Sequence, residues 1–363
     1  MVEPTLTALP DLAAERKAEL LRYVQSFYRR SWDWRSQKFH DMWDRDDRDY
    51  HSIYDPQRAA EKEDWQEIIH TGMVVTNVEV IHSQLYKTVA APNPMVETEA
   101  GPAGDELQAR LIQDCVAYQM DKAKFKVNFY HASKESVKYG DGFIKLYWEK
   151  VEDTRRRRMP VEQTPEQVLD TAPMDSLMGQ APMPSPRLQG FQFQNVKVMV
   201  KDHLAAKYVH IRDIFPEPNT TAWDKILHRD KITYGEIVRN ILNGSFFDVR
   251  GDLENVTEGE KFESDLQTIK YELGYVDEPR KLSKFEKRHT IWELWCPIPR
   301  KWIQFDIPEG DQAEELVPAK VMVASGTVLL ASEENDKFDG EVPILKIPYI
   351  PTGETYDMGV CDL

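Results

Sequence analysis

In three segments of the first 140 residues, apolar residues recur every three or four positions, which is the spacing of one helix face. The segment from Leu12 to about Asp47 is strongly amphipathic, because charged residues separate its apolar positions. A second helix is predicted after Gly72 and ends at the prolines of Ala91–Pro94, since proline lacks an amide donor. A third helical region runs to Tyr139, with a break near Lys122.

The pattern changes from helix to strand after Tyr139. Gly140-Asp141-Gly142 is a turn of the kind that closes a helix and begins a strand. Strands are predicted around 143–151 and 196–202, from aromatic and β-branched residues and from period-two alternation. Between them, residues 153–194 carry six prolines and few large apolar side chains, which is too little to offset the entropy of ordering. The pattern predicts a β-hairpin with a long, mobile insertion.

The C-terminal part predicts a β-rich portion from about 288 to 350. Paired strands are expected at Thr290–Trp295 and Trp302–Phe305, a hairpin around Ser325-Gly326, and helices at Thr233–Leu242 and Glu258–Leu273. The predicted fold class is α+β, with long N-terminal helices packed on an antiparallel β-sheet. Three regions follow from these patterns: a helical region ending in a strand (1–152), a Pro/Met/Gln-rich insertion (153–194) and an α+β region (195–363).

Charge and composition limit the classes of function that fit the sequence. The chain has 46 basic and 62 acidic residues and a net charge of −16, the opposite of the basic surplus that drives tight nucleic-acid binding. An acidic surface favours solubility and is also compatible with a conduit to which DNA does not adhere. Three distant cysteines suggest neither a disulfide framework nor a zinc site. Since no stretch approaches the length of a membrane span, no membrane partner is expected.

The sequence contains none of the strong catalytic signatures. GxxxxGK[ST], GxGxxG, HExxH and GxSxG do not occur, which favours a protein that is not an enzyme and needs no cofactor. One acidic group imitates a metal site: Asp44, Asp46, Asp47 and Asp49, with His40 and His51 nearby. Because Arg45 and Arg48 lie between these carboxylates, a solvated helix face with local ion pairs is the preferred interpretation.

Two further groups are candidates for contacts with other molecules. Arg155, Arg156, Arg157 and Arg158 form a basic run that could contact phosphates or a partner, or could only keep a proline-rich loop solvated. The stretch with Trp32, Trp34, Trp43 and Tyr50 has more aromatic residues than one amphipathic helix needs for its own core. Because aromatic side chains are typical interface anchors, these four are candidate subunit-interface residues, with packing inside the subunit as the equal alternative.

In their order along the chain and in their general residue pattern, these segments together resemble the N-terminal wing region of a tailed-bacteriophage portal protein. The segments that carry the resemblance are Ala91–Pro94, Tyr139–Glu149, Val209–Pro218, Trp292–Trp295, Gly340–Ile344 and Tyr349–Pro351. Of these, Tyr139–Glu149 is the most specific. The stem and clip that line the tunnel in the family have no positions here, so the chain is expected to be part of a longer subunit.

The resemblance implies a structural subunit of the ring, a homododecamer, at one capsid vertex of the virion. Its implied partners are other copies of the chain, the major capsid protein, the terminase motor during packaging, the head–tail adaptor and double-stranded DNA. The DNA passes through the ring non-specifically during packaging and ejection, and assembly takes place in the host cytoplasm. Two alternatives remain: another head–tail connector or minor capsid protein, and a metal-dependent nuclease that uses the Asp44–Asp49 cluster.

Overall fold

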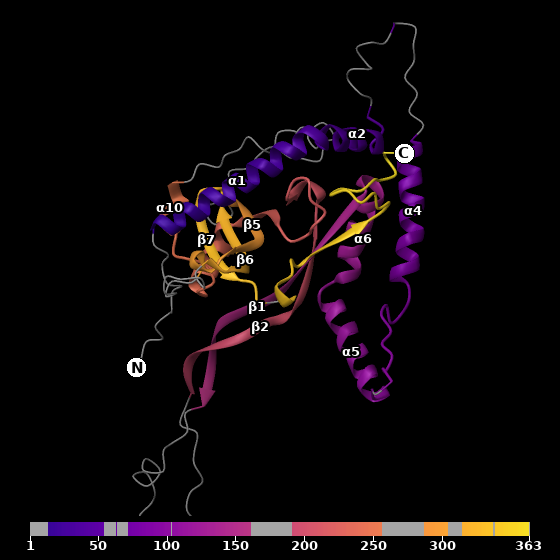
Figure 1. Ribbon diagram of the computed structural model, residues 1–363. Helices are drawn as coiled ribbons and strands as arrows, with labels where there is room; N and C mark the ends of the chain where they lie inside the picture. The colour runs from indigo at the N-terminus through magenta and orange to yellow at the C-terminus, as the bar shows by residue number, and fades with distance from the viewer. Residues whose placement is uncertain are drawn as a thin grey trace, which may run out of the picture.

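The computed structural model describes residues 14–53, 63, 72–102, 104–160, 191–255, 287–303, 314–336 and 338–362 (Figure 1). Its N-terminal half is helical, as the pattern predicted: α1 (Ala14–Lys38), α2 (His40–Tyr50), α4 (Met73–Ala90), α5 (Glu106–Lys122) and α6 (Phe125–Tyr139). The expected break after Lys122 is confirmed, because Lys124 has a positive φ of 51° and separates α5 from α6. Helices and antiparallel sheets together give the predicted α+β fold.

The larger sheet has five strands in the order β3-β4-β5-β6-β7. They are β3 (Ile214–Pro216), β4 (Ile226–Thr233), β5 (Arg288–Pro299), β6 (Leu316–Ala324) and β7 (Val328–Glu334). Helix α1 lies along this sheet (Figure 1) and buries Leu20, Val24 and Phe27 in the same core as Leu294 and Val321. These α1 positions are three or four residues apart because they share the one helix face that packs on the sheet.

The smaller sheet has the order β2-β1-β8, with β1 (Asp141–Pro160), β2 (Phe191–Val209) and β8 (Ile344–Pro348). Helix α6 packs on it through Phe129 and Ala132, which share a core with Ile144. The approach is close at Gly142, where an added Cβ would lie 1.9 Å from the carbonyl oxygen of Ala132. Only glycine fits between this strand and the helix.

The predicted hairpin is confirmed, and its strands are longer than the sequence pattern indicated. Residues 152–160 of β1 pair with residues 191–199 of β2, so Arg155–Arg158 belong to a strand and not to a loop. The prolines favoured the prediction of an insertion. A two-stranded ladder that no other element covers tolerates proline and charged residues, whereas a buried strand does not. The remainder of the predicted insertion, 161–190, lies outside the described residues.

The other local predictions have mixed outcomes. The hairpin at Ser325-Gly326 joins β6 to β7, and both turn residues have positive φ, 48° and 71°. The helix at Thr233–Leu242 is α9 (Tyr234–Leu242), with a capping box between Thr233 and Glu236. The strand expected at Trp302 is wrong, since Arg300–Trp302 is a 3-10 helix and β5 pairs with β4 and β6. The helix expected at 258–273 lies outside the described residues.

Candidate functional site

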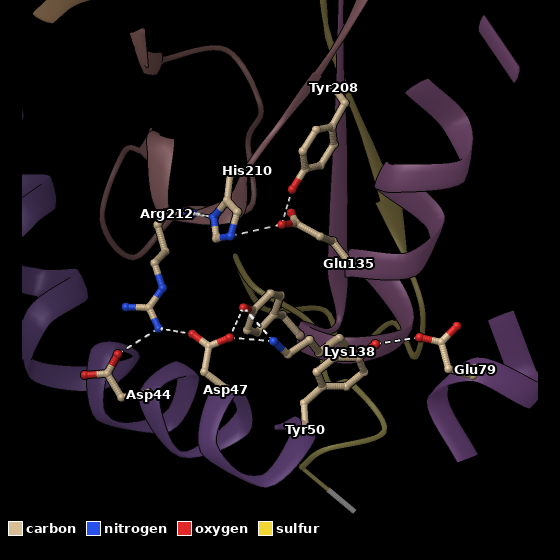
Figure 2. Close-up of polar contacts among 10 residues, drawn as sticks. Asp44, Asp47, Tyr50, Glu79, Glu135, Lys138, Tyr208, His210 and Arg212 are labelled. Carbon is tan, nitrogen blue, oxygen red and sulfur yellow. Dashed lines mark hydrogen bonds and ion pairs between the residues drawn. The ribbon is translucent and has the colours of Figure 1, made fainter. Parts of the chain in front are cut away.

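A group of charged, histidine and tyrosine side chains, most of them buried, lies where α2, α6 and the end of β2 meet (Figure 2). We call it the polar junction, and it consists of Asp44, Asp47, Glu135, Lys138, Tyr139, Tyr208, His210 and Arg212. Its residues come from α2, from the last turns of α6, from β2 and from the 3-10 turn Ile211–Asp213 that follows β2. The junction therefore connects segments that are more than 150 residues apart in the sequence.

Asp47 is the centre of the junction. Its Oδ1 accepts hydrogen bonds from Lys138 Nζ and Tyr139 Oη, both at 2.5 Å, and its Oδ2 accepts one from Arg212 Nη2 at 2.8 Å. Burial alone raises the pKa of Asp47, but the nearby charges of Lys138 and Arg212 lower it more, so the carboxylate stays ionised. Arg212 also pairs with Asp44 at 2.7 Å. These contacts compensate the charges that the fold buries.

Glu135 forms the second half of the junction. It accepts hydrogen bonds from Tyr208 Oη and, at 3.2 Å, from the backbone N–H of Ile211, and it lies 3.1 Å from His210 Nε2. Burial raises the pKa of Glu135 to about 8 and lowers the pKa of His210 to about 4. Burial therefore favours the uncharged form of both groups, and a hydrogen bond between them over an ion pair.

A third set of contacts joins α2 to α4. Tyr50 Oη donates to Glu79 Oε1 at 2.5 Å, and Lys134 Nζ of α6 lies 2.6 Å from the same oxygen (Figure 2 shows the Tyr50–Glu79 contact). These hydrogen bonds from Lys134 and Tyr50 lower the pKa of Glu79. Lys138 Nζ lies 4.6 Å from the centre of the Tyr50 ring, a cation–π contact that links this set to Asp47.

The C-terminal segment, which consists of β8 and the residues that follow it, packs next to the polar junction. Lys346 Nζ of β8 lies 3.3 Å from Asp141 and 2.7 Å from Asp357, and the backbone N–H of Asp357 donates to Asp141 Oδ2 at 2.8 Å. Gly140 ends α6 beneath this segment with a φ of 95°, and a Cβ there would lie 2.0 Å from the carbonyl oxygen of Asp357. The Gly140-Asp141-Gly142 turn is therefore the point where helix, strand and C-terminal segment come together.

Arg35 continues the network toward the larger sheet. Its fully buried guanidinium donates to the carbonyl oxygens of Ile214 at 2.5 Å and Arg212 at 2.9 Å, and it lies 3.9 Å from the centre of the Phe215 ring. The hydroxyl of Tyr356 donates to the same Ile214 oxygen at 2.9 Å. One buried cation of α1 thus holds the corner at which the chain passes from the smaller sheet to the larger.

The four aromatic interface candidates occupy different environments. Trp43 is fully buried in a cluster with Tyr139, Phe143 and Tyr356, so its prediction as an interface residue is wrong: the side chain fills the core of its own subunit. Trp32 and Trp34 are partly buried against the same chain, and Tyr50 takes part in the Glu79 contact. For Trp32, Trp34 and Tyr50 the interface stays a prediction.

The acidic cluster on α2 also differs from its prediction. Asp46 and Asp47 are buried, so the predicted solvated helix face is wrong. The partners of Asp47 are Lys138 and Arg212, and not the neighbouring arginines that the sequence suggested. Burial raises the pKa of Asp46 to about 7. Across the described ranges, no group of three or more His, Cys, Asp or Glu side chains is placed to hold a metal ion.

Sequence reasoning missed Glu135, Lys138, Tyr208, His210 and Arg212. A signal was present in α6, where Glu135 and Lys138 lie among residues that the apolar spacing assigns to the buried face. Buried charged residues require partners, so their positions on that face could have indicated an internal network. The partners themselves could not have been identified, because Asp47 and Arg212 are 165 positions apart.

The charges of the junction are directed at one another, an arrangement that holds elements together. Among the helices that the structure describes, none is long and apolar enough to cross a membrane. The family model of the phage SU10 portal protein matches residues 20–363, a range that contains the whole junction, both sheets and the helices α2, α4, α5, α6 and α9. No curated protein matches the chain. The match extends over nearly the full sequence, and the chain belongs to the phage SU10 portal protein family.

Proposed function

We propose that this chain is a structural subunit of the ring through which viral double-stranded DNA is packaged and ejected. The observation that carries the proposal is the family match over residues 20–363. Family membership implies a portal role, an oligomeric ring at the capsid vertex and a function that is structural and not enzymatic. The passage of DNA and the dodecameric state belong to the proposal.

The proposal includes a set of partners and a place in assembly. The ring contacts the major capsid protein, the terminase motor during packaging and the head–tail adaptor afterwards. The subunits assemble in the host cytoplasm and remain in the virion. Residues 1–152 and 195–363 form the wing region of the portal, and residues 153–160 and 191–194 of the segment between them continue its β1–β2 hairpin. The net charge of −16 supports DNA sliding, because like charges disfavour adhesion to the phosphate backbone.

The polar junction supports a mechanical role. A subunit in a ring that DNA is driven through has to keep its shape. The junction, together with the neighbouring contacts of Glu79 and Arg35, connects α2, α4, α6 and both sheets through charge-assisted hydrogen bonds. The metal-dependent nuclease gains no support from this geometry. Asp44 and Asp47, which would have to bind the cation, are paired with Arg212.

Negative-stain electron microscopy of the purified protein tests the proposal. The expected particles are closed rings of roughly a dozen copies with a central hole, since head-to-tail contacts that close generate cyclic assemblies. Monomers or small even oligomers at every protein concentration would contradict the proposal and favour a different connector or a minor capsid protein. A magnesium-dependent DNA cleavage that is lost in Asp46→Ala would instead support the nuclease alternative.

The remaining candidates enter the proposal as contact residues. Trp32, Trp34 and Tyr50 contribute to contacts with an adjacent subunit, and the strand Arg155–Arg158 contacts either phosphates or a protein partner. Trp34 is the most informative of the three aromatics, because its Nε1 donates to Asn219 Oδ1 at 3.1 Å, an exposed contact. Trp34→Phe removes this donor and retains an aromatic side chain. If the subunits of Trp34→Ala no longer assemble into closed oligomers and those of Trp34→Phe still do, the result supports an interface.

A further inference from the structure

Helix α5 exposes an apolar face. None of its 17 residues is buried. Leu107, Leu111, Cys115 and Tyr118 follow the spacing of one helix face, and the two leucines are 74% and 62% exposed. An isolated helix of this length is marginal in water, because most helical stability in proteins comes from packing of the apolar face. The exposed face of α5 is therefore suited to a partner.

A second exposed surface lies on the hairpin beyond Trp148. We call this part the arm, and it consists of residues 149–160 paired with residues 191–203. Met199 and Val200 are each 43% exposed, and Arg155–Arg157 are exposed. From residue 154 to 160 and from 191 to 198, the arm has five basic residues and no acidic one. At ~3.3 Å per residue its twelve-residue strand extends roughly 40 Å.

The two surfaces are complementary in charge, and both expose apolar side chains. Residues 105–122 of the α5 segment carry four acidic and two basic side chains, with Asp114 and Asp121 beside the apolar face. The arm offers apolar side chains near its base and a basic end. An apolar centre with opposite charges at the rim is the usual anatomy of a specific protein interface.

The arm of one subunit cannot cover its own α5 in this fold. Gln119 of α5 accepts a hydrogen bond from the backbone N–H of Leu204 at 3.2 Å, which fixes the end of the helix beside the base of the arm. From there the two elements diverge, with the arm at the lower left and α5 at the lower right of Figure 1. A cyclic ring needs two different patches on each subunit, and these two surfaces meet that requirement.

We propose that the arm of one subunit lies along the exposed face of α5 of the neighbouring subunit in the ring. This inference rests on the proposed function, because it requires a ring. Helix α5 is roughly 25 Å long, so the arm is long enough to span it. Met199, Val200 and Trp148 cover Leu107, Leu111 and Tyr118, and the arginines of the arm lie near the acidic side chains of α5.

Disulfide trapping tests the contact directly. Cys115 is a natural thiol on the exposed face of α5, and Cys296 is buried. Met199→Cys in the assembled protein is expected to give disulfide-linked dimers and higher multimers on oxidation, and the same variant with Cys115→Ser is expected to give none. Leu242→Cys, which places a thiol at a position on α9 that is 51% exposed, is the control. Intact rings without multimers for Met199→Cys, Val200→Cys and Trp148→Cys alike would overturn the proposal.

Assembly variants separate this inference from the proposed function. Leu111→Glu is expected to reduce the ring fraction at least about tenfold while the subunit stays folded, because the side chain has no role in the subunit's core. Leu316→Glu, at a position 63% exposed on β6, is expected to leave the rings intact. Rings that persist in Leu111→Glu refute the α5 contact alone, whereas a wild-type protein without rings refutes the proposed function.

A charge exchange distinguishes a protein partner from DNA. Arg155–Arg157→Glu is expected to reduce the ring fraction, and the additional changes Asp114→Lys and Asp121→Lys are expected to restore it, since opposite charges again face each other. If the arginine variant instead forms normal rings and binds double-stranded DNA less tightly at low salt, the arm contacts phosphates and the proposal is wrong.

Discussion

The two halves of the β1–β2 hairpin share one backbone ladder and have opposite environments. In the near half, Phe143 and Ile144 are buried between α6, β8 and the polar junction, and Lys145 pairs with Glu293 of the larger sheet. In the distal half, Trp148 is 46% exposed and Arg155–Arg157 are exposed. Strand pairing alone therefore does not decide whether a strand belongs to the core; the elements that cover it do.

This difference has an energetic consequence. A fully buried phenylalanine or isoleucine contributes about 1.5–3 kcal/mol by leaving water. A cross-strand pair on an uncovered ladder contributes about 0.2–1 kcal/mol, and an isolated two-stranded hairpin is marginally stable at best. The near half is thus stabilised by its own subunit, whereas the arm exposes apolar and basic side chains.

The largest expected effect comes from breaking the polar junction that anchors the near half. Arg212→Ala leaves Asp47 and Asp44 without their shared cation and is expected to cost about 3–5 kcal/mol in the free energy of unfolding of the unassembled subunit. Lys301→Ala, which removes an exposed pair with Glu314, is the control and is expected to cost about 0.5 kcal/mol or less. Equal denaturation midpoints for the two variants would argue against the junction as an anchor.

A smaller effect is expected where the near half begins. Gly142→Ala forces a Cβ against the Ala132 carbonyl, and such overpacking costs about 1–3 kcal/mol. Gly251→Ala, in α10 (Arg250–Asn255), has no atom within 4 Å of the added Cβ and is expected to be neutral or stabilising, since alanine favours helix more than glycine does. The melting temperatures of the two variants measure the difference. An unchanged melting temperature for Gly142→Ala would contradict the close approach of helix and strand.

The pH dependence of stability sharpens the account of Glu135. Its pKa of about 8 lies above that of the unfolded chain, so the folded state retains a proton that the unfolded state releases, and stability falls as the pH rises toward 8. The lowered pKa of His210 gives the opposite slope below about pH 6.5, whereas the raised pKa values of Asp46 and Asp141, both about 7, add to the slope of Glu135 up to about pH 7. Glu135→Gln is expected to remove up to about 1.4 kcal/mol per pH unit of this slope.

Denaturant unfolding at pH 6.5 and pH 8 measures that change in slope. Glu79→Gln is the control, because the pKa of Glu79 is lowered by its hydrogen bonds and its effect on stability therefore falls at acidic pH. If Glu135→Gln keeps the wild-type slope between pH 6.5 and 8, Glu135 is ionised in the folded subunit, and the neutral hydrogen bond with His210 is wrong.

The smallest effect is expected in the arm. Arg155–Arg157→Ser changes three exposed side chains and is expected to alter the free energy of unfolding of the unassembled subunit by about 0.5 kcal/mol or less. The measurement is chemical denaturation of the subunit at a concentration below that of ring formation. A loss of several kcal/mol would mean that the arm packs on its own subunit, contrary to the contrast between the two halves.

The sequence predicted correctly those elements whose residue pattern follows from their own packing face or their own backbone conformation. Helical spacing predicted α1, α4 and α6 because each packs one face on a sheet or a neighbouring helix, and Ser325-Gly326 predicted its hairpin because that turn needs positive φ. Residues 153–160 and 191–194 of the arm were assigned to an insertion, because a charged, uncovered strand lacks the apolar alternation that identifies a buried one.

The junction could not be predicted from the sequence for a different reason. The charges of Asp47, Lys138 and Arg212 are neutralised only when three distant segments come together, and nothing within α2 distinguishes a buried aspartate from a solvated one. The same limit applies to the aromatic stretch. Trp43 and Trp34 are nine positions apart and both contact Tyr356, but only Trp43 is fully buried, in a cluster that includes the distant residues Tyr139 and Phe143.

Hydrogen–deuterium exchange, compared between assembled wild-type protein and the Leu111→Glu subunit, tests the division of the molecule most directly. The account predicts that assembly slows exchange in α5 and in residues 149–160 and 191–203, and that the amides around Phe143 and the polar junction are equally protected in both states, because their partners lie within the subunit. Equal exchange of the arm and α5 in both states, or a junction protected only in rings, would contradict it.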